Sequence, residues 1–213
     1  MKYHSQHFQV EDSMAERRAN RHFVKSDGSE PVDAHQRQRD YLTSEEIRRL
    51  LAAARSGRHG PRDHAMLLLM YRHGLRVSEL VALRRSDLDL KTGHLWVHRL
   101  KRGLSTSHPL AGDELRALRR LLGKRQDRLP WLFLSERNQA MTRQAINYLV
   151  TVISERARLD AVHPHMLRHS CGHALAHSGR DLRLIQDYLG HRDPRHTARY
   201  TRTAATRFEG LWT

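Results

Sequence analysis

The chain has 213 residues, enough for one good-sized hydrophobic core or for one domain with a tail. Lysine and arginine total 38 against 23 aspartate and glutamate, a formal net charge of +15 that indicates a polyanionic partner such as nucleic acid. The single cysteine, Cys171, excludes an internal disulfide and a cysteine-rich zinc site. The longest apolar run, 65–71, is too short to span a membrane, and the N-terminus lacks the apolar stretch of a secretory signal. We therefore expect a cytoplasmic protein with no membrane partner.

The first 38 residues are polar and basic, and they show no helical or strand period. This composition predicts a flexible tail, because the segment has too few apolar side chains to build a core of its own. Folding signals begin only at Tyr41, so we place a single folded domain over residues 39–213.

The first half of this domain is predicted to be helical. Thr43 and Glu46 have the spacing of a capping box, and the apolar residues of 47–54 fall on one helical face. After a break at 57–61, the segment 65–70 is apolar nearly all round, which predicts a helix at the centre of the core. Gly74 suits the end of that helix, and a short helix follows over 77–83.

Beyond Asp87 the period changes to that of strands. Apolar and polar side chains alternate over 94–100, Gly103 marks a turn, and 105–110 suits a return strand. These segments predict a β-hairpin with Lys101 and Arg102 at its tip. Helical spacing returns over 115–122, and 131–134 is expected to be a short buried strand or extended segment.

The last third is predicted to be helical again. Thr142 can cap one helix, and after Pro164 three more are expected over about 164–178, 182–189 and 195–207. Gly179 and Gly190 are natural stops between them. The whole pattern predicts an α+β fold that is mostly helical, with one small antiparallel β-sheet.

Five short segments hold side chains suited to work on a phosphodiester: 73–80, 100–103, 163–169, 189–191 and Tyr200. Taken singly, each has an ordinary explanation. Arg76 would be a solvated arginine near a helix N-terminus, and His165 and Arg168 a pair on one helix face. His191 would be a loop histidine pinned by the preceding glycine, and Tyr200 a surface tyrosine among polar neighbours.

Together these segments supply every part of a phosphoryl-transfer site. The reaction needs positive charge against the non-bridging oxygens, a nucleophile, and an acid for the leaving oxygen. Arginine guanidinium groups and imidazoles provide the positive charge without a metal. A tyrosine hydroxyl forms a covalent phosphodiester, and a lysine on a hairpin provides the proton for the leaving oxygen.

The motifs His165-x-x-Arg168, Leu-Gly-His191 and Tyr200, preceded by Gly-Leu-Arg76-x-Ser-Glu-Leu, resemble those of the tyrosine recombinase (phage integrase) family. The likeness covers about 41–213 and makes 39–213 a recombinase catalytic domain. Within the family, the likeness is greatest to the short fimbrial phase-variation DNA invertases. Four segments closely resemble those proteins: 98–103, 105–110, 163–172 and 184–191. Those proteins also lack the separate N-terminal core-binding domain of longer integrases.

The resemblance implies a role for each of six side chains, in a reaction that cuts and rejoins DNA through a 3′-phosphotyrosyl bond. Arg76 and Arg168 would clamp the scissile phosphate, and Tyr200 would be the nucleophile. His165 would act as a donor or proton shuttle, and His191 would bind a phosphate oxygen. Lys101 would be the general acid, although the family usually has glycine where this chain has Arg102, so the two could exchange roles. Glu79 would support Arg76 or the fold, and His169 would be structural.

The same resemblance implies the partners of the protein. These are double-stranded DNA with inverted-repeat target sites, three further copies of the chain in a homotetramer on two sites, and accessory DNA-bending proteins. The protein itself would be associated with the nucleoid. No cofactor and no metal are implied. The apolar residues after the tyrosine, Phe208, Leu211 and Trp212, would dock on a neighbour or pack on their own domain. The basic residues of the tail would add phosphate contacts and a steep salt dependence.

Two other functions are compatible with the sequence. A DNA-binding transcriptional regulator could keep the recombinase fold without catalysis. His169, His173 and His177 are spaced four apart on one helical face, as metal ligands could be. Inversion, integration and excision share the same chemistry, so the motifs leave the outcome of recombination open.

Overall fold

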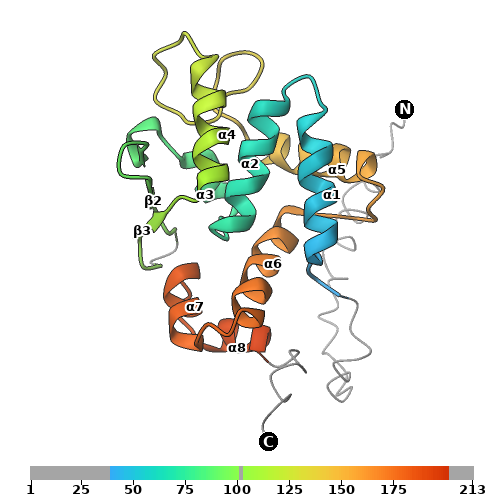
Figure 1. Ribbon diagram of the computed structural model, residues 1–213, viewed down its shortest axis with the longest axis vertical. Helices are drawn as coiled ribbons and strands as arrows, with labels where there is room; N and C mark the ends of the chain where they lie inside the picture. The colour runs from blue at the N-terminus through green and yellow to red at the C-terminus, as the bar shows by residue number, and fades with distance from the viewer. Residues whose placement is uncertain (1–38, 101–102, 202–213) are drawn as a thin grey trace, which may run out of the picture. The chain divides into compact units, whose positions relative to one another are not determined.

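The computed structural model describes residues 39–100 and 103–201 (Figure 1). The predictions for the tail 1–38, for Lys101 and Arg102, and for Phe208, Leu211 and Trp212 lie outside these residues. The described part is mostly helical and carries one three-stranded antiparallel sheet, which confirms the predicted fold class.

Two helices at the start of the domain form much of the core. α1 (Ser44–Arg55) opens with the predicted capping box: Thr43 Oγ1 accepts the Glu46 N–H, and the Glu46 carboxylate accepts the Thr43 N–H. α2 (Gly60–Arg72) begins earlier than its Gly-Pro sequence suggested, because proline fits the first turn, where its missing N–H is not needed. Every side chain from 63 to 70 in α2 is buried, so this helix is central, as predicted.

The sheet follows a short helix, α3 (Val77–Ala82), and a 3₁₀ turn at Arg85–Asp87. Its order is β1 (Leu88–Asp89), β2 (His94–Val97) and β3 (Thr106–Pro109), all antiparallel. β2 and β3 make the predicted hairpin, whereas β1 was missed because two residues are too few to show an alternating period. Leu95 and Val97 point into the core, as the alternation predicts.

The remaining helices are α4 (Gly112–Gly123), α5 (Arg143–Arg156), α6 (Pro164–His177), α7 (Leu182–Leu189) and α8 (Arg195–Thr201). Thr142 caps α5, and Gly179 and Gly190 end α6 and α7 with positive φ angles, as predicted. The segment 131–134 makes only isolated bridges at its two ends and no strand. None of the described helices is long and apolar enough to cross a bilayer.

Buried apolar side chains form two clusters. The larger cluster contains side chains from each of the helices α1, α2, α3, α4 and α5, from the sheet, and from the start of α6. The smaller lies among α6, α7 and α8, and contains Cys171, Ala176, Ile185, Leu189 and Tyr200. α6 belongs to both clusters, and Figure 1 shows it running from the α1–α2 pair to α7 and α8 at one end of the domain.

Candidate active site

Arg76 is held at the N-terminus of α3 by the carboxylate one turn later. Its backbone N–H donates to Glu79 Oε2 at 2.9 Å, and its Nη1 donates to Glu79 Oε1 at 2.6 Å. The turn before it depends on Gly74, whose φ of 55° lies in the left-handed region that favours glycine. The Arg76 side chain keeps 26 % of its surface exposed, so it remains accessible to a ligand.

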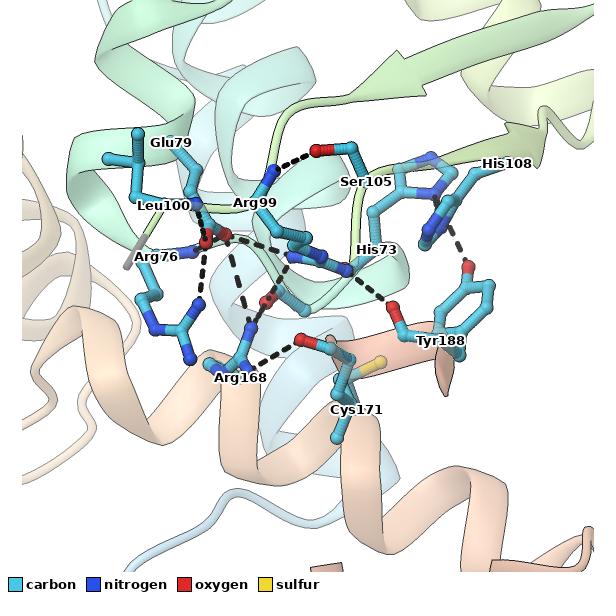
Figure 2. Close-up of polar contacts among 12 residues, drawn as sticks. His73, Arg76, Glu79, Arg99, Leu100, Ser105, His108, Arg168, Cys171 and Tyr188 are labelled. Atoms are coloured by element: carbon cyan, nitrogen blue, oxygen red, sulfur yellow. Dashed lines mark hydrogen bonds and ion pairs between the residues drawn. The ribbon is translucent and has the colours of Figure 1, made fainter. Parts of the chain in front are cut away.

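Arg168 reaches the same carboxylate from α6. Its side chain is buried, Nη2 donates to the Leu189 carbonyl at 2.8 Å, and Nη1 donates to the Gly74 carbonyl. The same Nη1 lies 4.0 Å from Glu79 Oε2, so the guanidinium groups of Arg76 and Arg168 converge on one carboxylate (Figure 2). Two arginines on opposite faces of the fold would have ended the recombinase hypothesis, and the structure brings them together.

Glu79 is the buried anion of the site. Burial favours its neutral form, but the charges of Arg99 and Arg76 and the bond from the Arg76 N–H outweigh burial and lower the pKa. Burial also lowers the pKa of Arg168, to about 10, so that its guanidinium stays charged at neutral pH. The sequence motif had suggested support for Arg76 or the fold, and the carboxylate does support Arg76.

Tyr200 is not a surface tyrosine. Only 1 % of its surface is exposed, and its hydroxyl lies 3.1 Å from His169 Nδ1. The ring stacks on His191 with 6.1 Å between ring centroids and meets the edge of His173 at 5.3 Å. A Cβ at Gly172 would lie 2.6 Å from the Tyr200 ring, so the glycine makes room for it. Burial raises the pKa of the phenol.

His191 is fixed beside Tyr200 by the loop that follows α7. Gly190, with φ 66°, ends the helix, and the His191 N–H then donates to the Gln186 carbonyl at 2.9 Å. Its Nδ1 lies 2.9 Å from the hydroxyl of buried Thr197. Burial and the charge of Arg168 lower the His191 pKa to about 3, so the imidazole is neutral at pH 7.

His165 is exposed on α6, one turn before His169. The two rings meet edge to face with centroids 4.7 Å apart, which connects His165 through His169 to the Tyr200 hydroxyl. Partial burial and the charge of Arg168 lower its pKa. His165 therefore stands at the outer edge of the site, and its role as a donor or proton shuttle stays a prediction.

Lys101 and Arg102 fall outside the described residues, but both residues that flank them contact the site. The Leu100 N–H lies 3.4 Å from Glu79 Oε1, and the Gly103 N–H donates to the Leu100 carbonyl at 3.3 Å. A Cβ at Gly103 would lie 2.9 Å from the Gly190 carbonyl oxygen. The ends of this loop are therefore next to Glu79 and to the turn before His191.

Sequence reasoning missed Arg99, which is buried at the centre of this network. Its Nη1 donates to Glu79 Oε2 at 2.9 Å (Figure 2). The alternation of the strand carried a signal for it, because Arg99 continues the buried face of Leu95 and Val97. A charged residue in register with a buried face needs a buried partner, and that requirement could have linked it to Glu79.

The three histidines of the alternative metal site have other contacts. His173 stacks on Tyr41 with 3.8 Å between centroids, and His177 Nδ1 donates to the His173 carbonyl at 3.2 Å. His169 contacts Tyr200. Over 39–100 and 103–201, no group of three or more histidine, cysteine or acidic side chains is arranged to hold a metal ion.

Comparisons with known proteins agree with this geometry. Residues 40–207 match the model of the "Phage integrase family". Type 1 fimbriae regulatory protein FimB of Escherichia coli K12 is 46 % identical over 184 residues, which cover 84 % of this chain and 92 % of that protein. Type 1 fimbriae regulatory protein FimE of the same strain is 46 % identical over 180 residues, which cover 82 % of this chain and 91 % of that protein.

The fold is also that of solved recombinases. The crystal structure of XerA recombinase superposes with a TM-score of 0.70 at 29 % identity, covering 78 % of this chain and 61 % of that one. XerH site-specific recombinase bound to its palindromic difH substrate has the same TM-score at 22 % identity, covering 84 % of this chain and 54 % of that one. The chain therefore belongs to the phage integrase family of tyrosine recombinases.

Proposed function

We propose that this protein cuts and rejoins double-stranded DNA through Tyr200, as a DNA invertase that controls phase-variable expression of fimbriae. The observation that carries the proposal is the convergence of Arg76 and Arg168 on Glu79, within the cluster of side chains that also holds His191 and Tyr200. The likeness to two fimbriae regulatory proteins along nearly their whole length supports the fimbrial role.

In this proposal the two arginines bind the non-bridging oxygens of the scissile phosphate. Arg168 is already fixed by the carbonyls of Gly74 and Leu189, and Arg76 by Glu79. Charges that are oriented before DNA arrives need little reorganisation when negative charge builds up in the transition state. His191, neutral and anchored to Thr197, adds a hydrogen bond to a phosphate oxygen.

The covalent step conserves every atom and charge. The Tyr200 oxygen attacks phosphorus, a 3′-phosphotyrosyl bond forms, and the bond from phosphorus to the 5′-oxygen breaks. The phenol proton passes to an imidazole, for which His165 is our candidate, and Lys101 or Arg102 donates a proton that turns the leaving oxygen into a 5′-hydroxyl. Attack by the 5′-hydroxyl of another strand reverses the step, so no nucleotide cofactor is needed.

Before attack, the phenol must turn away from His169 toward the phosphate. Tyr200 stands on α8, whose described part is Arg195–Thr201 and packs on α6 and α7. Besides the ring contacts of Tyr200, one exposed ion pair, from Arg199 to Asp40, connects α8 to the start of the domain. A helix with so few charged ties can shift at small free-energy cost when DNA enters the site. The buried hydroxyl in this structure is therefore the resting state of the proposed nucleophile.

The proposed assembly follows from the chemistry of strand exchange. Two sites carry four strands to be cut, so four copies of the domain 39–213 would act on inverted-repeat DNA, with accessory proteins bending it. XerH and the Tn1549 integrase were solved with DNA, which supports DNA as the partner of this fold. The basic tail would strengthen binding through phosphate contacts, and affinity would fall steeply with salt.

A nicked suicide DNA tests the proposed chemistry directly. The DNA is a set of duplexes that carry inverted repeats searched for in the DNA beside the gene, each nicked so that the fragment with the freed 5′-hydroxyl diffuses away. The wild-type protein should form an adduct that survives denaturant, and Tyr200→Phe should form none. Tyr148→Phe is the matched control, because Tyr148 is 70 % exposed on α5, and it should react like the wild type.

The same experiment separates the enzyme from a catalytically silent regulator. DNA binding by the wild type without an adduct on any cognate nicked site would favour the regulator. If the adduct forms, a plasmid with two sites in inverted orientation then tests the outcome, and a flipped segment is expected. Excision or integration alone would contradict the invertase assignment while leaving the phosphotyrosyl chemistry in place.

A further inference from the structure

A cavity of about 360 Å³ lies between the end of α1, the start of α2 and α4. Cavities of about 300–1,000 Å³ accept small molecules, so this one has room for a small ligand. None of the residues that line it belongs to the candidate active site. The cavity is at the start of α2, whereas the site lies beyond its end, and a helix of 13 residues is about 20 Å long. Figure 1 likewise shows α7 and α8 toward the opposite end of the domain from the α1–α2 turn.

Three of the residues that line the cavity are arginines. Arg55 ends α1, and Arg116 and Arg120 stand four residues apart on α4, so that they share one face of that helix. A glycine lets the two sides of the cavity approach each other, because a Cβ at Gly60 would lie 2.1 Å from the Arg55 carbonyl oxygen. The tight turn between α1 and α2 thus sets Arg55 opposite the two arginines of α4.

Positive charge is in excess around this cavity. Asp113 is the one acidic residue that lines it, and its Oδ2 is already paired with Arg72 Nη2 at 2.9 Å. Within residues 39–100 and 103–201, no ion pair or hydrogen bond is formed by the side chains of the three arginines, Arg55, Arg116 and Arg120. Three unpaired guanidinium groups around one concave space favour an anionic ligand.

His64 forms the buried wall of the cavity. Only 7 % of its surface is exposed, and its Nε2 is buried without a hydrogen-bond partner in the described part of the chain. Burial and the charge of Arg55 lower its pKa to about 4, so the imidazole is neutral at pH 7 and can donate one N–H. Buried polar groups are nearly always hydrogen-bonded, so this unpaired imidazole beside a basic cavity indicates a polar partner that enters it.

We propose that the cavity binds a small anion that carries two or more phosphate groups. Guanidinium groups bind phosphate oxygens through paired, charge-assisted hydrogen bonds. A ligand that meets Arg55 on one side and Arg116 and Arg120 on the other needs an anionic group at each side. A free ligand suits this space better than a DNA backbone, because a duplex runs along an open surface and the cavity is concave and small. The proposal uses no residue of the candidate active site, so it does not rest on the proposed function.

Titration calorimetry of the full chain with inorganic triphosphate tests the proposal. Arg116 and Arg120 are exposed, so Arg116→Gln and Arg120→Gln should fold, and each should weaken binding about tenfold. The matched control is Arg119→Gln, which removes the same charge from the same helix. Its side chain donates to the Leu90 carbonyl and does not line the cavity, so binding should stay within about twofold of the wild type.

Several results of this titration would overturn the proposal. Equal losses in all three variants would show a general effect of charge. Unchanged binding in all three would place the triphosphate elsewhere, for example at Arg76 and Arg168, and no binding to the wild type would reject the site outright. Inorganic phosphate, with a single group, should bind about tenfold more weakly than triphosphate. Equal affinities for the two, or tighter binding of citrate, would overturn the proposed class of ligand.

His64→Leu separates a ligand contact from a packing role. Because Nε2 has no partner among the described residues, an apolar side chain of similar size should not lower the free energy of unfolding without ligand. It should weaken triphosphate binding by about 2- to 10-fold, the worth of one hydrogen bond. A loss of stability in urea denaturation with unchanged affinity would show that His64 only packs, and would overturn the proposal.

DNA is the other source of phosphate groups, and a second measurement tests it. Fluorescence anisotropy with a labelled duplex of unrelated sequence gives the affinity of each variant for DNA. Arg116→Gln and Arg120→Gln should weaken duplex binding no more than Arg119→Gln does. Losses as large as those seen with triphosphate would assign the cavity to the DNA backbone and overturn the small ligand. Failure of the wild type to form an adduct on nicked DNA would reject the proposed function and leave both binding measurements unaffected.

Discussion

The arginine pair, Arg76 and Arg168, and the tyrosine helix, α8, are held in different ways. The arginines are fixed by charged and backbone bonds to Glu79, Gly74 and Leu189. The hydroxyl of Tyr200 contacts one neutral imidazole, and its ring packs on aromatic edges and a glycine. The arginine pair is fixed by buried charged bonds before any ligand arrives. The α8 region is packed mainly by neutral contacts around Tyr200, with one exposed ion pair from Arg199 to Asp40.

The difference matches the work that each region would do. A phosphate clamp gains from being oriented in advance, because reorienting charges during the reaction raises the barrier. A nucleophile that must be hidden at rest and delivered to DNA gains from contacts that are easily exchanged. Removing the anchors of each region in turn tests whether the arginine pair and α8 differ in this way.

Glu79→Gln should have the largest effect, since it removes the one carboxylate that faces Arg76, Arg99 and Arg168. Breaking a buried ion pair on one side leaves uncompensated charge, so we expect a loss of about 3–5 kcal/mol in the free energy of unfolding. Urea denaturation at pH 7 measures it. The control is Glu45→Gln, whose pair with Arg48 is at the surface and should matter little. Similar losses in both variants would show that the arginine pair is not locked.

A second effect should appear in the dependence of stability on pH. Burial and the charge of Arg199 lower the His169 pKa to about 4, whereas an unfolded histidine titrates near 6.5. The unfolded state binds the extra proton between these values, so stability falls as pH drops from about 6.5 to 4, by up to about 1.4 kcal/mol per pH unit for this group.

The variant His169→Gln should flatten that slope. Unfolding free energies measured at steps of pH between 4 and 7 give the number of protons taken up on unfolding. His94→Gln, at an exposed position of β2, is the control and should leave the slope close to that of the wild type. An unchanged slope in His169→Gln would mean that burial and the charge of Arg199 do not keep this imidazole neutral.

Gly172→Ala should release the tyrosine helix. Alanine normally favours a helix over glycine, but here its Cβ would lie 2.6 Å from the Tyr200 ring. We expect a loss of about 1–3 kcal/mol from overpacking, with faster hydrogen exchange confined to α8. Gly123→Ala is the control, because nothing lies within 4 Å of the added carbon. Faster exchange spread over α1 and α2 would instead indicate general unfolding.

The smallest change in stability is expected for Tyr200→Phe. It removes one hydroxyl that contacts His169 and keeps the ring in its pocket, so the loss should be about 1 kcal/mol or less. Denaturation under the conditions used for Glu79→Gln gives the comparison. A loss of several kcal/mol would show that the hydroxyl, and not the ring, holds α8 in place.

Most of the fold was predictable because its signals are local. The capping box at Thr43, the all-apolar run in α2 and the glycines that end α6 and α7 each act within one or two helical turns. β1 was missed because a two-residue strand exists only through its pairing with β2. The residues of the proposed site were also readable, as motifs that resemble a known family, although their roles stay proposals.

Local patterns in the sequence were enough to predict the fold class, the order of the helices, and which residue types could act on a phosphodiester. Tertiary structure decided that Tyr200 is buried against His169, and that Arg99 joins Glu79 to the Tyr188 carbonyl. These partners lie 20 to 89 positions apart along the chain. Helix caps and hydrophobic periodicity depend on residues that are close together in the sequence. A buried charge, in contrast, meets its partners only after elements that are distant in the sequence have packed together.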